Sequence, residues 1–360
     1  MKKIAYVINS IKKNGPSNVI LNLIDELNQN QYKIYLITLF DEDDDIIIER
    51  LKKNNIKIKQ FKMTSRLYSI FFAEKSFYHY IKQEKINILH SHGFIPDIIS
   101  ARLYSKKLLR ISTIHNNMFE DYNDEYGELK GKIYSLIHLY FLKRLDYCIG
   151  CSESVYNSIK NNLKNATYIR NGIEKQILNG SCISRSDLNI PEYATIFIYV
   201  GRIDKRKNVK FLVDKFTRYH NNDEYLLILG SGEEYNKCLQ VSDNHTKMLG
   251  FIDNPSAYYY ISDIYISASK SEGMSISVLE AMDYGLGLFL SNISSHKEIF
   301  SIANDIYVGE LFNEKTFVES FVKLRKNKWR INRESIRGIK EKELSIRVMT
   351  SKYESYYKLG

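Results

Sequence analysis

The chain of 360 residues is long enough for two hydrophobic cores, and 44% hydrophobic with 26% charged residues excludes a disordered or fibrous protein. No apolar run approaches the roughly 20 residues that span a membrane, and the N-terminus lacks a signal-peptide cleavage pattern, so we expect a cytoplasmic protein. The net charge of +10 lies mostly in residues 1–180, which hold 27 Lys+Arg against 19 Asp+Glu. Without any nucleic-acid-binding motif, this charge favours an anionic membrane surface or a phosphate-bearing acceptor over nucleic acid.

Strand and helix signals alternate along the first half of the chain. Residues 4–8 and 34–39 carry apolar strand patterns, and residues 19–27 and 47–52 follow them with helical periodicity. The alternation restarts in the second half, with strand patterns at residues 195–200, 226–229, 264–267 and 288–290. Repeated βα alternation predicts parallel sheets covered by helices on both faces.

These two series of βα units predict an α/β protein of two doubly wound domains. We expect the first over residues 1–170, a linker rich in Asn, Gly and Ser over 171–190, the second over 191–335, and a C-terminal helix over 336–360.

Four cysteines in a chain of this length do not form a disulfide framework; they are Cys148, Cys151, Cys182 and Cys238. The pair Cys148-x-x-Cys151 has the spacing of a redox or zinc motif. It lies in a strand pattern, however, where residues three apart point to opposite faces, and no second Cys/His pair follows. We therefore predict buried thiols.

Two carboxylates eight residues apart, Glu272 and Glu280, flank a strand-to-helix junction. With Ser275 as the helix N-cap, Glu280 lies about five residues into the helix, roughly 7.5 Å along its axis. Free N–H groups at a helix start favour a diphosphate, and carboxylates accept hydrogen bonds from sugar hydroxyls. This pattern suits a sugar nucleotide. The alternative is that both acids simply complement the helix dipole.

The stretch Glu272–Met282 resembles the E-x7-E signature of retaining glycosyltransferases of the GT4-type family (glycosyl transferases group 1), which have the GT-B fold. Further segments resemble the family in the same order, at residues 169–173, 200–208, 229–232 and 249–251. Looser matches lie at residues 14–17, 89–93 and 113–115. The resemblance implies two Rossmann-like domains facing each other across a cleft, an N-terminal one for the acceptor and a C-terminal one for the nucleotide sugar. It also implies that the last helix crosses back to the first domain.

The resemblance also implies roles around the diphosphate of a UDP- or GDP-sugar. Arg202 and Lys207 follow the first strand of the second sheet, at the carboxyl end where such sheets bind ligands, and would contact the diphosphate. Gly201 would allow close approach of the backbone, and Gly15 would face the diphosphate from the other domain. Neither a metal nor a cofactor is then expected. The neighbouring Lys205 and Arg206 are predicted to form a solvated turn.

Sugar and base contacts are implied in the same way. Glu280 would bind the ribose and Glu272 the transferred sugar. The supporting backbone amides would be those of Gly273, Met274 and Ser275, and the base-binding edge would be Phe251 and Ile252. Many relatives carry an aromatic residue and a glycine in place of Met274 and Ser275, which leaves the identity of the sugar open.

Histidines at strand ends of the first half are further candidates. The resemblance places His115 against the donor sugar near the reacting centre, and we predict it to be catalytic together with Glu272, Arg202 and Lys207. His90 and His92 either line the acceptor groove or merely finish a strand.

The expected activity is metal-independent, retaining transfer of a hexose to a saccharide in cell-surface polysaccharide synthesis, such as capsule or lipopolysaccharide. Residues 65–75 and 133–144 mix bulky apolar side chains with cations. A packed amphipathic helix is the default interpretation of each, and attachment at an anionic bilayer is the alternative. With the basic first half, this favours a lipid-linked acceptor and peripheral attachment at the inner face of the plasma membrane.

Three other interpretations remain. Residues 41–45 resemble the Asp-x-Asp metal element of GT-A glycosyltransferases, although five consecutive acids favour a solvated loop and a second βα series has no place in that fold. A nucleotide-sugar epimerase shares the GT-B scaffold but needs no acceptor. A non-catalytic partner subunit would keep the fold without the site.

Overall fold

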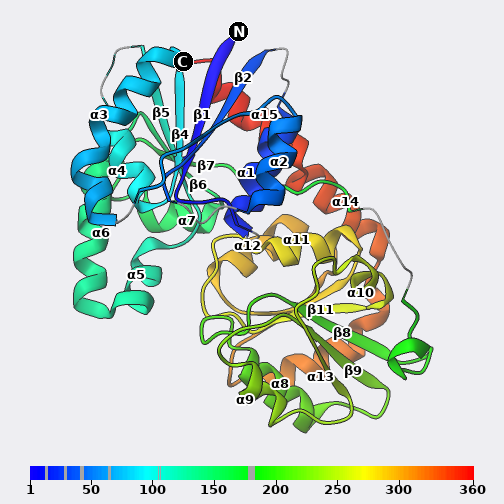
Figure 1. The fold of residues 1–360 in the computed structure, drawn as a ribbon. Coiled ribbons are helices and arrows are strands. Elements are labelled where there is room, and N and C mark those ends of the chain that lie inside the picture. Colours follow the sequence, from blue (N-terminus) through cyan, green and yellow to red (C-terminus); the bar gives the residue numbers. More distant parts are fainter. Residues whose placement is uncertain are drawn as a thin grey trace. The chain divides into compact units, whose positions relative to one another are not determined.

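The computed structural model describes residues 1–12, 15–27, 31–40, 44–63, 66–103, 105, 107–176 and 183–360, with the side chains of 66–74 left out. The chain divides into two compact units (Figure 1). The first unit comprises Met1–Gly172 together with Ile346–Gly360, and the second comprises Ile173–Ser345. Each unit is built on its own parallel sheet, which confirms the predicted pair of Rossmann-like α/β domains.

The first unit has a seven-stranded sheet in the order β3-β2-β1-β4-β5-β6-β7. Its strands are β1 (Lys2–Ile8), β2 (Tyr32–Thr38), β3 (Lys57–Gln60), β4 (Ile88–His92), β5 (Leu109–Ile114), β6 (Tyr147–Gly150) and β7 (Ala166–Tyr168). Its helices are α1 (Gly15–Glu26), α2 (Asp45–Lys53), α3 (Arg66–Glu84), α4 (Phe94–Arg102), α5 (Met118–Tyr126), α6 (Glu128–Leu142), α7 (Glu153–Ile159) and α15 (Ile346–Tyr357). The strand order reverses direction between β1 and β4, which makes their carboxyl ends the expected ligand edge.

The central strands of this sheet are buried on both faces. All five residues of β4 and residues 4–8 of β1 are buried, which explains why such strands show continuous apolar runs rather than alternation. Val7, Leu89 and Ile99 belong to the core on one side of the sheet, together with Tyr35 and Phe77.

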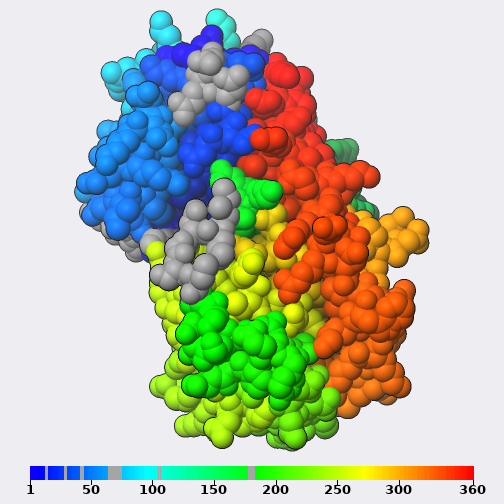
Figure 2. All heavy atoms as spheres, turned by 90° about the vertical axis from the view of Figure 1, so that its right-hand side faces the viewer, coloured from blue at the N-terminus to red at the C-terminus, as the bar shows by residue number. Residues whose placement is uncertain are grey.

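The C-terminal helix α15 completes the first unit by packing on α1. Figure 2 shows its red residues lying against the blue N-terminal part of the unit. The Nζ of Lys2 donates to the carbonyl of Tyr357 at 3.1 Å, and the Tyr357 hydroxyl lies 2.9 Å from that of Tyr6. The helical region expected over 336–360 is divided at Ser345, because α14 packs on α11 and α12 of the second unit.

The second unit has a six-stranded sheet in the order β10-β9-β8-β11-β12-β13. Its strands are β8 (Thr195–Val200), β9 (Glu224–Leu229), β10 (Thr246–Gly250), β11 (Ile264–Ser267), β12 (Gly287–Ser291) and β13 (Gly309–Phe312). Its helices are α8 (Val209–Tyr219), α9 (Tyr235–Leu239), α10 (Ser256–Ile261), α11 (Ile276–Asp283), α12 (Ser294–Ala303), α13 (Phe317–Asn327) and α14 (Arg333–Leu344), with 3-10 turns at Ser186–Leu188 and Lys328–Arg330. Strand order reverses between β8 and β11.

Several local predictions can be compared directly with the structure. Cys148 lies in β6 and Cys151 directly after it, and both are buried free thiols, as predicted; Cys182 lies outside the described residues. Of the acidic run, residues 41–43 are also outside that part, while the Asp44 carboxylate caps α2 by accepting from the Ile46 and Ile47 N–H groups. No helix in the described part of the chain is long and apolar enough to cross a membrane.

Candidate functional site

The candidate site of the second unit lies where β8 and β11 end. These neighbouring strands flank the point at which the sheet order reverses, so the loops after them form the expected ligand edge. Arg202 and Lys207 belong to the loop after β8, and Glu272 belongs to the loop after β11. The structure therefore brings together three of the four residues predicted to be catalytic.

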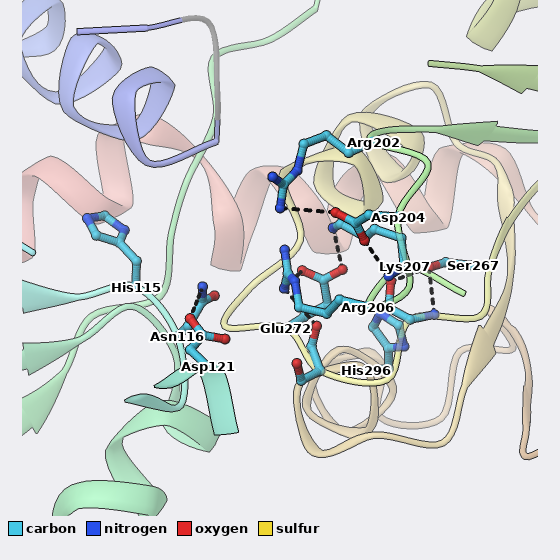
Figure 3. A network of polar contacts seen from close by, with 12 residues as sticks. His115, Asn116, Asp121, Arg202, Asp204, Arg206, Lys207, Ser267, Glu272 and His296 are labelled. Carbon is cyan, nitrogen blue, oxygen red and sulfur yellow. Dashed lines mark hydrogen bonds and ion pairs between the residues drawn. The ribbon is translucent and has the colours of Figure 1, made fainter. Parts of the chain in front are cut away.

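Glu272 is the centre of this cluster, and its side chain is only 7% exposed. The Nζ of Lys207 donates to its Oε1, and a guanidinium nitrogen of Arg206 lies 3.5 Å from its Oε2 (Figure 3). Burial by itself would raise the pKa of Glu272, but the two cations outweigh it and lower the pKa to about 2. Glu272 is thus a fixed negative charge at any physiological pH.

Arg206 corrects the sequence prediction of a solvated turn. Besides pairing with Glu272, its guanidinium donates to the Ser271 carbonyl at 2.9 Å, and its own carbonyl accepts from the Lys270 N–H at 2.9 Å. These contacts join the loop after β8 to the loop after β11. Lys205, by contrast, is exposed, as predicted.

Arg202 reaches into solvent. Its side chain is 71% exposed, and a guanidinium nitrogen lies 3.2 Å from Oδ2 of Asp204. The other oxygen of Asp204 accepts from the backbone N–H of Lys207 at 2.8 Å, which shapes the loop between the two cations. Arg202 can therefore turn toward a bound anion without breaking a buried contact.

Glycine allows the ends of β8 and β9 to approach each other closely. Gly201 and Gly230 have φ angles of +154° and +149°, and a Cβ on Gly230 would lie 1.8 Å from the Gly201 carbonyl oxygen. A side chain at position 230 would push the two strand ends apart. Gly201 thus lies at a point of tight backbone packing beside Arg202.

Helix α11 begins as the sequence predicted, with Ser275 at its N-cap. The Ser275 hydroxyl makes no capping hydrogen bond, and α11 has no acidic residue in its first turn. Gly273 and Met274 are buried immediately before it. Neither acid of the motif therefore lies in the first turn of α11, where the helix dipole would act on it most strongly.

Glu280 is the fifth residue of α11 and is partly buried. Its Oε2 accepts a hydrogen bond from the Tyr259 hydroxyl at 3.0 Å, donated from α10. Burial raises the pKa of Glu280 to about 7, and the tyrosine only partly opposes this. The sequence did not point to Tyr259, because it is one of three consecutive tyrosines on a short helix.

His296 is a second residue that sequence analysis missed. It lies in the first turn of α12, and its Nδ1 is 2.9 Å from the Ser291 carbonyl. Its Nε2 has no hydrogen-bond partner among the described atoms, and burial lowers its pKa to about 4. The sequence could have pointed to His296 because it lies at a helix start directly after β12, at the same edge of the sheet.

Phe251 and Ile252, the predicted base-binding residues, directly follow β10. That strand is at the edge of the sheet, two places from β8. The Phe251 ring is 65% exposed and is free to stack on a planar ligand. Its role in base binding stays a prediction.

The first unit holds the other predicted residues. Gly15 is the first residue of α1, and His115 directly follows β5, where its Nε2 lies 2.9 Å from Nδ1 of His92. Burial lowers the pKa of His115 to about 4, so its ring is neutral at physiological pH. Figure 3 shows His115 beside Asn116, whose amide donates to Asp121.

His90 does not line a groove, which corrects one of the two interpretations offered for it. It is fully buried, with Nδ1 at 2.7 Å from the Tyr357 hydroxyl and Nε2 at 2.8 Å from the Thr113 hydroxyl. Thr113 also contacts the Tyr353 hydroxyl at 2.8 Å. His90 therefore anchors α15 to the sheet.

Comparisons with known proteins agree with this architecture. The family model described as Glycosyltransferase Family 4 matches residues 13–176, and that described as Glycosyl transferases group 1 matches residues 183–342. The O-antigen biosynthesis glycosyltransferase WclY of Escherichia coli is 28% identical, covering 99% of this chain and 98% of its own. The UDP-Gal:alpha-D-GlcNAc-diphosphoundecaprenol alpha-1,3-galactosyltransferase of Escherichia coli is 25% identical, covering 91% and 88%. The structure of Anabaena Alr3699/HepE in complex with UDP and glucose has a TM-score of 0.78 at 11% identity, covering 100% of both chains.

Proposed function

The chain belongs to the glycosyl transferases group 1 family of GT4 type and has the GT-B fold, and we therefore propose that it is a retaining hexosyltransferase. The donor is a UDP- or GDP-sugar. The acceptor is a lipid-linked saccharide in the synthesis of a cell-surface polysaccharide.

The observation that carries this proposal lies at the carboxyl ends of β8 and β11, where Arg206 and Lys207 pair with the buried Glu272. The exposed Arg202 belongs to the same loop as these two cations and pairs with Asp204. The departing nucleoside diphosphate develops negative charge that must be stabilised, either by a metal ion or by fixed cations. Three cations in the loop after β8 would supply that stabilisation, so we propose a metal-independent reaction. Retention of configuration is part of the proposal because the family resemblance implies it.

In this proposal the two carboxylates contact different parts of the donor. Oε2 of Glu280 accepts from Tyr259, and within the part of the chain that the structure describes its Oε1 has lone pairs left to accept from the ribose hydroxyls. Glu272 accepts from hydroxyls of the transferred sugar while Lys207 turns toward the diphosphate. The roles of Gly15 and His115 toward the donor stay predictions.

Similar proteins support the proposed substrate classes. The galactosyltransferase relative uses a UDP-sugar and a saccharide on diphosphoundecaprenol, and the structural neighbour HepE was solved with UDP and glucose. The excess of cations in residues 1–180 fits an acceptor that carries phosphate on a lipid.

Calorimetric titration with UDP, GDP and their hexose derivatives tests the donor site. Glu280→Ala is expected to abolish nucleotide binding, and Glu272→Ala to remove chiefly the preference among hexoses. Glu334→Ala, an exposed acid on α14, is the matched control and should bind as the wild type does. Full activity in both site variants would refute the assignment.

Turnover assays separate the remaining outcomes. Transfer to a polyprenyl-diphosphate saccharide that persists in excess EDTA supports the metal-independent reaction, and loss of turnover in EDTA refutes it. A new epimer of the nucleotide sugar, formed without any acceptor, would identify an epimerase instead. Absence of all nucleotide binding would identify a non-catalytic subunit.

A further inference from the structure

Helix α6 of the first unit packs with its less apolar face inward. Its buried residues are Gly131, Ser135, His138, Leu139 and Leu142. Five of its exposed apolar side chains, which we call the α6 stripe, are Leu129, Ile133, Leu136, Ile137 and Tyr140; Tyr134 is exposed too but is not part of the stripe. The members of the α6 stripe are 40 to 76% exposed and recur at helical spacing, so they form one continuous strip along the helix.

This polarity is the reverse of an ordinary surface helix. In α8 of the same protein, Val209, Leu212 and Phe216 are buried, and the polar residues face outward. Single exposed apolar side chains are common on protein surfaces and need no explanation. A contiguous strip of five on one helix is typical of a surface that binds a protein or a membrane.

Polar contacts fix α6 in this orientation. The Nε2 of His138 lies 2.9 Å from Oδ2 of Asp97 on α4, and its Nδ1 lies 2.8 Å from the Tyr122 hydroxyl on α5. Gly131 packs so closely on α5 that a Cβ there would lie 2.4 Å from Oδ1 of Asn123. Rolling the helix to bury the α6 stripe would break both hydrogen bonds of His138 and drive bulky side chains into α5. The outward direction of the stripe is therefore built into the packing.

Cations border the α6 stripe on both sides. On a helical projection centred on Ile133, Lys130 lies about 60° to one side, and Lys132 lies about 100° to the other. Lys143 and Arg144 follow at the C-terminal end of the helix, and all four cations are exposed. The Arg144 guanidinium carbon is 3.6 Å from the centroid of the Tyr140 ring, so a cation and an aromatic ring end the stripe together.

We propose that the α6 stripe binds the surface of an anionic phospholipid bilayer, with α6 lying in the plane of the headgroups. Aliphatic side chains would enter the acyl boundary, the lysines would meet lipid phosphates, and the tyrosine would lie at the interface. Cations on both sides of an apolar strip complement the anionic headgroups that border the acyl region of such a bilayer. Figure 1 places α6 at the periphery of the first unit, beyond α4.

Membrane binding by the α6 stripe would hold the enzyme at the lipid that carries its acceptor. Only this purpose rests on the proposed function. Binding itself is measured without donor or acceptor, so it can succeed even where sugar transfer fails. Conversely, transfer to a water-soluble saccharide is expected to be unchanged in variants of the α6 stripe.

Co-sedimentation with vesicles tests the proposal. The wild-type protein is expected to bind vesicles of phosphatidylcholine with 30% phosphatidylglycerol at least tenfold more tightly than pure phosphatidylcholine vesicles. Ile133→Gln/Leu136→Gln should lower the affinity for the anionic vesicles at least tenfold, and Lys130→Gln/Lys132→Gln should weaken the salt dependence of binding. Leu239→Gln, which alters a side chain that is 53% exposed in the second unit, is the matched control and should bind as the wild type does.

A fluorescence measurement keeps the proposal falsifiable if a glutamine variant fails to fold. Leu136→Trp in a Trp329→Phe background places the only tryptophan of the chain on the α6 stripe. Its emission is expected to shift to the blue with anionic vesicles alone. No shift, or unchanged vesicle binding by the folded double glutamine variant, overturns the proposal. A dimer in sedimentation equilibrium that Ile133→Gln/Leu136→Gln converts to monomer also overturns it, because the stripe would then be a contact between two copies of the chain.

Discussion

Glu280→Gln separates the cost of burying a carboxylate from its use in binding. Burial raises the pKa of Glu280 from 4.5 to about 7, so the folded protein holds an ionised Glu280 only above about pH 7. The amide of glutamine keeps an oxygen that can accept from the Tyr259 hydroxyl but carries no charge. The variant therefore removes the titration and keeps the shape.

The sign of the effect follows from proton binding. Between pH 4.5 and about 7 the folded state holds a proton on Glu280 that the unfolded chain has released, so stability falls as the pH rises through this window and stays reduced above it. The difference between the two pKa values corresponds to about 3 kcal/mol at pH 8 and to less than about 1 kcal/mol at pH 5. We expect the variant to be more stable than the wild type by these amounts.

Urea unfolding followed by circular dichroism, at pH 5 and at pH 8, measures this difference. Glu192→Gln, which alters an exposed acid outside any helix, is the control and should leave stability unchanged at both pH values. A stability gain that is the same at pH 5 and pH 8 would show that burial does not raise the pKa of Glu280, and would refute this reasoning.

The same pair of proteins tests the role of the charge in binding. If the Glu280 carboxylate accepts from ribose hydroxyls, the affinity of the wild type for UDP-glucose falls as the pH drops below about 7, approaching tenfold per pH unit. The glutamine variant should bind weakly at every pH. A wild-type affinity that does not change between pH 6 and pH 8 would contradict this role.

Three further predictions concern side-chain and backbone packing within each unit. Lys207→Met is expected to lower stability by roughly 3 kcal/mol, because it leaves the buried Glu272 without its main partner, and Lys207→Met/Glu272→Gln should recover most of that loss in urea unfolding. Tyr357→Phe removes the partner of two buried polar groups and should cost about 1–3 kcal/mol by the same measurement, with secondary structure preserved. Gly230→Ala should lower the thermal midpoint because its Cβ meets the facing backbone carbonyl, whereas Gly338→Ala, in open space on α14, should not lower it.

Strands and their order along the chain could be predicted because parallel strands buried on both faces show continuous apolar runs. The strand expected over 195–200 coincides with β8, and the helix expected after Ser275 begins there. The loops after β8 and β11 could be placed at one edge of the sheet for the same reason: a doubly wound topology fixes where strand ends meet.

Contacts between segments distant in sequence could not be predicted. Arg206 and Lys205 are adjacent and chemically similar, yet only the first reaches Glu272, because the direction of each side chain depends on how the loop after β11 folds over it. His90 carried a strand-end signal, but its environment is set by Tyr357, 267 residues later in the chain. The pattern of α6 predicted an amphipathic helix without revealing that small and polar residues would occupy its buried face.

The two carboxylates of one motif have different pKa values because their surroundings differ. Glu272 lies among cations that lower its pKa to about 2, so it is ionised whether or not a ligand is bound. Among the described residues, Glu280 accepts one side-chain hydrogen bond, from Tyr259, and burial raises its pKa, so the arrival of further donors would favour its ionised form. A ribose offers two such donors, and binding it would therefore draw Glu280 into its ionised form and release a proton near neutral pH. A buffer-dependent enthalpy of nucleotide binding at pH 6.5, absent in Glu280→Gln, is the expected sign of this coupling, and an enthalpy that is the same in buffers of different ionisation heat would exclude it.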